Sequence, residues 1–119
     1  MLYGKLRPNL NKVYLAEEQG ICSTDILVLR FVSADDAKYY ANYMRTSSFN
    51  AEVLKGVSGQ QLPRTSWSHI QNIAVPKLSA VDLRDRVSAI KKVESALHAA
   101  QIIIDAAPAK KQAVMQKYL

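Results

Sequence analysis

The feature that most constrains this chain is a long amphipathic segment that begins at Ser79. Its apolar residues recur at alternating spacings of three and four, as in an interrupted heptad pattern. The pattern predicts one α-helix over residues 79–107, about 40 Å long at 1.5 Å per residue. Such a helix cannot bury its own apolar stripe, and the chain has no second helix of comparable length. We therefore expect a helix–helix interface with another chain through Leu83, Val87, Ile90, Val93, Leu97 and Ile104.

Local signals mark the two ends of this predicted helix. Ser79 followed by Asp82 resembles a capping box, with Asp in place of the usual Glu. Pro108 has no amide hydrogen to donate, so we expect it to break or kink the helix, with a second helical piece running to Leu119. These signals divide the chain into a first region, residues 1–78, and a helical region, residues 79–119.

The first region has the mixed periodicity of an α+β domain. Short strands are predicted over residues 1–6, 12–16, 25–32 and 73–75. Helical segments are predicted over residues 34–46, 49–55 and 67–70. A turn at Pro8 joins the first two strands, because proline fixes the backbone there. Residues 56–66, which contain two glycines and a proline, are predicted to form a loop.

Side-chain spacing in this region predicts a small core. Ser33 is placed to cap the helix that starts at Ala34, with two aspartates in its first turn at the positive end of the helix dipole. Four residues of that helix are expected to face the core: Ala37, Tyr40, Ala41 and Met44. We also assign three residues outside that helix to packing: Tyr3, Trp67 and Ile70.

The sequence offers little support for catalysis. The single cysteine, Cys22, has no nearby histidine, and a lone cysteine usually acts as a small apolar residue. His69 and His98 have no ligand-spaced Cys or His beside them, which argues against a metal site. The chain also lacks a phosphate-binding glycine loop, a dinucleotide turn and a nucleophile elbow. We therefore expect a non-catalytic chain without metal or cofactor.

Targeting signals are also absent from the sequence. No apolar run approaches the roughly 18 residues of a membrane span. The first residues lack the basic and then apolar pattern of a secretory signal peptide. A single cysteine excludes an internal disulfide framework. A cytoplasmic location without membrane association is the resulting expectation.

Positive charge is concentrated in patches. The net charge is +6, and three windows carry cations without any acid: residues 1–16, 53–81 and the segment around Lys110. Patches of this kind attract phosphate backbones or acidic partners. The alternative is a basic protein whose lysines are simply solvated. Charge alone does not separate these interpretations.

Planar and basic side chains cluster in two loops of the first region. Arg and Lys bind phosphates and can recognise guanine, whereas Asn and Gln can pair with adenine. Each such residue could equally occupy an ordinary exposed turn, so it is the combination with the charge patches that favours a nucleic-acid face. The candidate DNA-binding residues are Lys5, Arg7, Asn9, Asn11, Lys12, Gln60, Gln61, Arg64 and Ser66.

Four blocks, in their order and spacing, resemble the specificity subunit of type I restriction–modification systems. The blocks are LYGKLRPNLNKVYLA, GICSTDILVLR, YYANYMRTSSF and GQQLPRTSWSHIQNIAVPKLS, and a long helix follows them. The resemblance covers nearly the whole chain. It implies an α/β target-recognition domain that reads half of a split DNA site, followed by a conserved long helix. One departure is PKLSAVDLRDR, where the family usually has a proline-rich PPL segment and then Glu-Gln.

The resemblance also implies partners and a missing part. A complete subunit has two recognition domains and two long helices that pack together and bind methyltransferase subunits, which a restriction subunit joins. In the family, LYGKLRP lies well inside a recognition domain. The chain is therefore expected to be the later part of one such domain, over residues 1–78, plus its helix. By this resemblance it binds double-stranded DNA and has no active site of its own.

Two further hypotheses stay open. A truncated domain could fail to read DNA while its helix still captures a methyltransferase subunit, a second specificity chain or a second copy of itself. Alternatively, the chain could be an inactive relic whose exposed half-core makes it prone to aggregate. Leu97→Asp and Arg64→Ala separate the assembly hypothesis from DNA reading, since the first variant disables only the helix.

Overall fold

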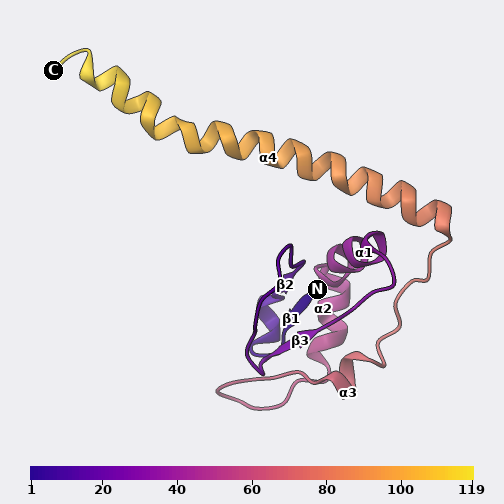
Figure 1. Cartoon of the computed structure of the whole chain (residues 1–119). Coiled ribbons are helices and arrows are strands. Elements are labelled where there is room, and N and C mark those ends of the chain that lie inside the picture. Colours follow the sequence, from indigo (N-terminus) through magenta and orange to yellow (C-terminus); the bar gives the residue numbers. More distant parts are fainter. The chain divides into compact units, whose positions relative to one another are not determined.

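The computed structural model describes residues 1–119, which form two compact units, Met1–Leu83 and Arg84–Leu119. The first unit contains a small antiparallel sheet and short helices, and the second is part of one long helix (Figure 1). The predicted α+β class is confirmed at this level. The predicted division lay between residues 78 and 79, whereas the two units meet between Leu83 and Arg84.

Three short strands form the sheet of the first unit. They are β1 (Leu2–Gly4), β2 (Val13–Tyr14) and β3 (Ile26–Val28), in the spatial order β2-β1-β3 with antiparallel pairing throughout. Tyr3 of β1 lies opposite Val13 on one side and Leu27 on the other. All three strands are shorter than predicted. The strand predicted at 73–75 is wrong, because the Ile73 amide donates to the Ile70 carbonyl and continues a helical turn.

The core lies between this sheet and the helices. Tyr3 is fully buried and meets Phe49 edge-to-face, with ring centroids 6.5 Å apart. Met44, Val53 and Ile70 complete the buried cluster. Aromatic pairs in this arrangement add about 0.5–1.5 kcal/mol beyond the burial of their area. The assignments of Tyr3 and Ile70 to packing are confirmed, whereas Trp67 is 48% exposed.

Side-chain caps begin the three short helices. In α1 (Ala34–Met44) the Ser33 hydroxyl accepts from the Asp36 amide at 3.0 Å, as predicted. Thr46 caps α2 (Ser47–Leu54) and Ser66 caps α3 (Trp67–Ile70) in the same manner. These hydroxyls satisfy amides that would otherwise lack a partner in the first turn.

The inner face of α1 agrees with the prediction only in part. Tyr39, Ala41 and Met44 are buried, whereas Ala37 and Tyr40 are only half-buried. The Tyr40 ring stacks on Phe31, with centroids 5.5 Å apart, and its hydroxyl donates to the Pro76 carbonyl at 3.0 Å. Periodicity alone could not anticipate this, since the stacking partner lies outside the helix.

The turn between β1 and β2 is a short 3-10 helix, η1 (Pro8–Leu10). Arg7 before it and Asn11 after it both have left-handed backbone, with φ of 50° and 45°. Such conformations are uncommon for residues other than glycine and asparagine. The Asn11 amide side chain donates to the Arg45 carbonyl at 2.9 Å, which ties the end of this turn to α1.

The long helix α4 spans Ala80–Gln116 without interruption (Figure 1). Ser79 begins it as predicted: its hydroxyl accepts from the Asp82 amide at 3.1 Å and donates to the Asp82 carboxylate at 2.7 Å. Of the two effects predicted for Pro108, a break or a kink, the break is wrong, because the helix is continuous there. Alanines at 106, 107 and 109 surround this proline, and alanine has the highest helix propensity. Pro108 still removes the hydrogen bond that the Ile104 carbonyl would accept.

Candidate nucleic-acid interface

Two loops that are distant in sequence lie side by side in the first unit. The Arg7 amide donates to the Pro63 carbonyl at 2.8 Å, and the Thr65 amide donates to the Lys5 carbonyl at 3.1 Å. Leu6 and Arg64 form a single antiparallel bridge between these bonds. The segment 5–12 and the loop 57–66 therefore form one continuous surface, which we call the paired-loop surface.

The loop 57–66 is closed on itself at its base. Ser58 and Arg64 exchange both backbone hydrogen bonds, at 3.0 and 2.9 Å. Gly59 follows with φ of 91°, a conformation that residues with a Cβ rarely adopt. Gln60 and Gln61 then occupy the exposed end of the loop. Their side chains are free to reach a ligand because neither amide is held by the protein.

Arg64 forms an ion pair with Asp25. The Arg64 Nε donates to Asp25 Oδ1 at 2.9 Å, and Nη2 donates to Oδ2 at 3.4 Å. The pKa of Asp25 lies below its usual value because of this hydrogen bond and the charge of Arg64, with smaller contributions from Lys5 and Lys12. The same bond raises the pKa of Arg64. Three cations thus surround one carboxylate, which leaves a local excess of positive charge.

Lys12 and Lys5 are held close to this carboxylate by the turn between β1 and β2. The Lys12 side chain lies over Gly4, so closely that a Cβ at Gly4 would lie 3.1 Å from Lys12 Cε. The Lys5 amide donates to the Asp25 carbonyl at 2.8 Å. Arg7 and Asn9 are exposed on the same turn. The absence of a side chain at Gly4 therefore leaves room for the Lys12 side chain beside the ion pair.

Besides Arg64, two predicted DNA-binding residues have structural partners. The Asn11 side-chain Nδ2 donates to the Arg45 backbone carbonyl, and the side-chain oxygen Oδ1 of Asn11 is buried without a hydrogen-bond partner. The Ser66 hydroxyl accepts from the His69 amide at 3.3 Å and lies 2.8 Å from the Ser68 hydroxyl. The Asn11 side chain fixes the end of the β1–β2 turn, and the Ser66 side chain caps α3. These two side chains therefore shape the paired-loop surface and are less available to bind a ligand.

Sequence reasoning missed Asp25. Asp25 immediately precedes β3 and is separated from Arg64 by 39 residues, so no local pattern links them. Arg45 was also missed: its guanidinium donates to the Val13 carbonyl through Nε at 3.3 Å and Nη2 at 3.0 Å. Only an alignment of covarying positions could have indicated these pairs from sequence.

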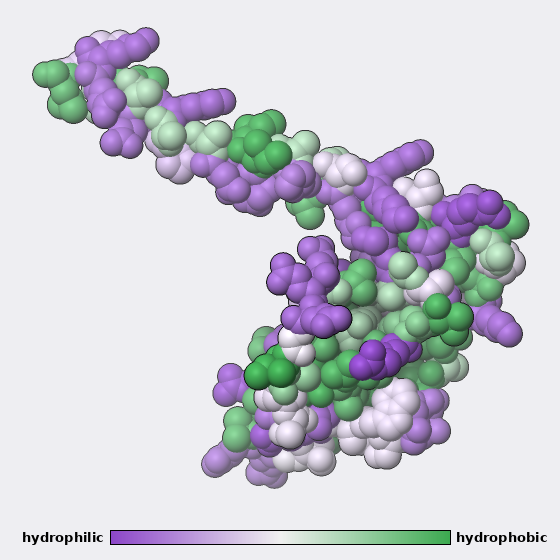
Figure 2. Space-filling view, in the orientation of Figure 1, coloured by the Kyte–Doolittle hydropathy of each residue, from purple (hydrophilic) through white to green (hydrophobic).

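The apolar stripe predicted for the long helix lies along α4, and its residues differ in how much of each side chain is exposed to solvent. Val87 is buried, and Leu83 and Ile90 are half-buried. Val93, Leu97 and Ile104 are 70%, 67% and 61% exposed. Figure 2 shows hydrophobic residues at the surface of this helix among hydrophilic ones. An exposed apolar stripe of this length is typical of a helix that packs against another chain.

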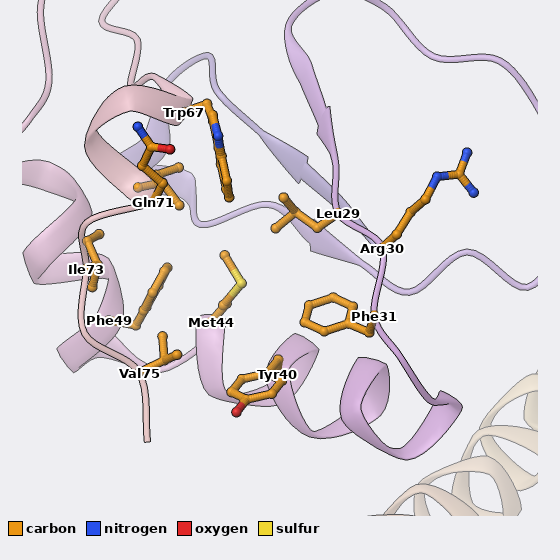
Figure 3. A pocket seen from close by; sticks show the side chains of 11 residues that line it. Leu29, Arg30, Phe31, Tyr40, Met44, Phe49, Trp67, Gln71, Ile73 and Val75 are labelled. Atoms are coloured by element: carbon orange, nitrogen blue, oxygen red, sulfur yellow. The ribbon is translucent and has the colours of Figure 1, made fainter. Parts of the chain in front are cut away.

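An apolar groove opens on the first unit beside the end of β3. It has a volume of about 380 Å³, and Leu29 and Phe31 form one wall (Figure 3). Trp67, Ile73 and Val75 form the opposite wall, with Met44 and Phe49 at the base. We call it the β3 groove. No local sequence pattern predicts this groove, because the residues that line it come from segments far apart in the chain.

No helix of the protein has the length and apolarity needed to cross a membrane. The structure contains no group of three or more His, Cys, Asp or Glu side chains arranged to hold a metal ion. Comparisons with protein families, with curated proteins and with solved structures find no match for this chain.

Proposed function

We propose that this chain is a DNA-recognition component of a type I restriction–modification complex. The observation that supports it best is the joining of the segment 5–12 to the loop 57–66 by the Arg7–Pro63 and Thr65–Lys5 hydrogen bonds. This joining places most of the candidate DNA-binding side chains on one surface. A positively charged surface with exposed amide side chains suits a nucleic acid, because cations bind phosphates and amides can recognise base edges.

Distinct roles follow from the positions of these side chains. Lys5, Arg7 and Lys12 bind phosphates, since they are basic residues on the turn. Arg64 is oriented by Asp25, so its remaining N–H groups form a fixed fork for a phosphate or a guanine. The candidate base readers are the amides on the turn and at the loop end, namely Asn9, Gln60 and Gln61.

Within the complex the chain performs no chemistry itself. Residues 1–78 form part of a target-recognition domain, and α4 docks the methyltransferase subunits through its stripe. The restriction subunit joins that assembly in the cytoplasm. The resemblance of the sequence blocks supports these partners, and the exposed stripe supports docking through α4.

Salt-dependent binding to a duplex pool of mixed sequence tests the DNA proposal. Losing one phosphate contact lowers the magnitude of the log–log salt slope by about 0.9. Arg7→Ala should show this decrease, because Arg7 is exposed and its side chain has no protein partner. Lys77→Ala removes an equal charge outside the paired-loop surface and should leave the slope unchanged. Equal slopes for the two variants would rule out this surface as the DNA site.

A second candidate function is assembly through α4 without DNA reading. The exposure of Val93, Leu97 and Ile104 favours it independently of the paired-loop surface. Light scattering with a type I methyltransferase subunit tests it. Leu97→Asp should abolish the heteromer, whereas Ser95→Asp places the same charge off the stripe and should preserve it. If the wild-type chain forms neither a heteromer nor a dimer, the stripe has no assembly role.

A further inference from the structure

The backbones of Asp25 and Arg64 are held in place by a shared neighbour, Lys5. The Lys5 amide donates to the Asp25 carbonyl at 2.8 Å, and the Lys5 carbonyl accepts from the Thr65 amide at 3.1 Å. On its other side Arg64 exchanges two backbone hydrogen bonds with Ser58, at 3.0 and 2.9 Å. The ion pair between the two side chains is therefore built on a backbone that is fixed at both ends.

The Asp25 carboxylate occupies only one edge of the Arg64 guanidinium. Nε donates to Oδ1 at 2.9 Å and Nη2 donates to Oδ2 at 3.4 Å, whereas Nη1 has no partner in the protein. A guanidinium is planar and carries donors on more than one edge. Its free edge here consists of an N–H from Nη1 and an N–H from Nη2. Because these donors are parallel, they fit a ligand that presents a pair of adjacent acceptors.

This free edge can be reached from solvent. The side chain of Arg64 is 45% exposed and that of Asp25 is 36% exposed. Arg64 stands at the base of the loop 57–66, where its bonds to Ser58 form a narrow two-stranded ribbon. A ribbon of this kind can enter the major groove of DNA, which is about 12 Å wide. The position of Arg64 therefore suits a contact with a base edge in that groove.

Charge distinguishes a phosphate from a base as the ligand of Arg64. Affinity for phosphates depends mainly on positive charge that replaces counterions. Asp25 neutralises Arg64 at hydrogen-bonding distance, and its carboxylate would also repel a phosphate at the free edge. A base edge has no net charge, so the parallel donors can bind it without this repulsion. Phosphates are better served by Lys5, Arg7 and Lys12, which have no carboxylate bonded to them.

We propose that Arg64 recognises a guanine in the major groove and that Asp25 is the residue that positions it. Guanine presents two acceptors there, N7 and O6, whereas adenine presents an acceptor and a donor, cytosine a donor, and thymine one acceptor beside a methyl group. Asp25 both directs the free edge of Arg64 and lowers its affinity for phosphate. This inference rests on the proposed DNA function and deepens it, because it assigns one base of the target.

A duplex pool with a randomised central segment tests the proposal on the full chain. Bound duplexes are recovered and sequenced, and affinities for one of them are measured by fluorescence anisotropy. We expect a position at which guanine is enriched, and adenine there should weaken binding about tenfold to a hundredfold.

Base analogues then identify the atoms that are recognised. Each enriched guanine is replaced in turn by 7-deazaguanine, which lacks the N7 acceptor, and at one position this should weaken binding about tenfold. Inosine at that position lacks only the amino group in the minor groove and should bind about as well as guanine. Both changes are made in the DNA, so the result does not depend on the folding of a variant.

A charge-neutral double variant separates base recognition from phosphate binding. Arg64→Ala combined with Asp25→Ala should lose the guanine preference and keep the log–log salt slope of the wild type. If Arg64 held a phosphate, the magnitude of that slope would instead fall by about 0.9. The matched control combines Glu52→Ala with Lys55→Ala, which removes another exposed ion pair and should change neither property.

Asp25→Asn tests the positioning role by itself. The variant should prefer guanine less and bind the whole pool more tightly, because Arg64 loses its fixed direction and gains charge for phosphates. A purely structural role of Asp25 would weaken the binding of all duplexes alike.

Four results would overturn the inference while the chain still binds DNA. They are the absence of a guanine-enriched position, equal affinity for guanine and 7-deazaguanine at every enriched position, a guanine preference that survives in the double variant, and a salt slope that falls in it. A chain that binds no duplex of the pool would overturn the proposed DNA function and this inference together.

Discussion

Arg64 binds Asp25 at two points, Nε to Oδ1 at 2.9 Å and Nη2 to Oδ2 at 3.4 Å. The pair connects the loop 57–66 to the start of β3, beside the Lys5 backbone. It therefore determines both the direction of the Arg64 guanidinium and the local balance of charge on the paired-loop surface. Removing the carboxylate changes the two properties together, and their effects on DNA binding can be predicted.

Asp25→Asn should strengthen unspecific DNA binding at low salt. The substitution removes the carboxylate among Lys5, Lys12 and Arg64, so the magnitude of the log–log salt slope should rise. Fluorescence anisotropy with labelled duplex DNA over a salt series measures this. Glu52→Gln is the matched control, because Glu52 is also an ion-paired surface acid but lies on α2. An equal gain in both variants would mean that net charge alone matters.

Low pH should remove the stabilising effect of the Asp25–Arg64 ion pair. The folded-state pKa of Asp25 is lowered, so the pair stabilises the protein above the ordinary Asp pKa of about 3.9. This contribution is lost as the pH falls through the lowered pKa. We expect the Tm of the wild type to exceed that of Asp25→Asn slightly at neutral pH, as for an exposed pair, and to converge with it in acid. Parallel Tm curves across that range would contradict this.

Local sequence signals predicted the parts of the fold that depend on near neighbours. Ser33 and Ser79 cap their helices, because a cap needs only an amide three residues away. The turn of helix at Trp67–Ile70 was also predicted, although its cap at Ser66 was not. The break predicted at Pro108 is wrong, since the local rule against proline was outweighed by the helical propensity of its neighbours.

The candidate sites depend on contacts between distant segments, and these were less predictable. The charge map indicated both loops, but the Thr65–Lys5 bond that joins them spans most of the first unit. Asp25 and Arg45 act through partners more than thirty residues away, as the separations of 39 and 32 residues show. The β3 groove needs walls from three segments, so no single stretch of sequence could reveal it.

Gly56→Ala should destabilise the first unit by about 1–3 kcal/mol, as overpacking does in well-packed sites. A Cβ at Gly56 would overlap the ring of His69. That ring must then move, and it would lose the 2.8 Å bond between Nε2 and the Glu52 carbonyl that joins α3 to α2. Urea unfolding measures the change. Gly20→Ala is the control, because nothing lies within 4 Å of its added Cβ. Equal stability of the two variants would show that the His69 position is not constrained.

Tyr3→Phe should stabilise the protein by about 1 kcal/mol at neutral pH. The Tyr3 ring is fully buried and its hydroxyl has no hydrogen-bond partner, so removing that oxygen relieves a desolvation penalty while the packing with Phe49 is kept. Burial also raises the pKa of Tyr3 to about 12. An unfolded tyrosine ionises near about 10. The neutral buried form therefore favours folding below pH 10, and this contribution is lost as the pH rises from 10 toward 12.

The free energy of unfolding measured above pH 10 distinguishes this effect of the Tyr3 hydroxyl from a general change in packing. In urea unfolding, the advantage of Tyr3→Phe over the wild type should grow above pH 10, because phenylalanine cannot ionise in the unfolded chain or in the folded one. Tyr118→Phe is the control, since Tyr118 is 83% exposed and the substitution removes the same hydroxyl from the surface. A Tyr3→Phe variant that is less stable than the wild type at neutral pH would instead show that the hydroxyl is hydrogen-bonded in solution, with an internal water as its partner.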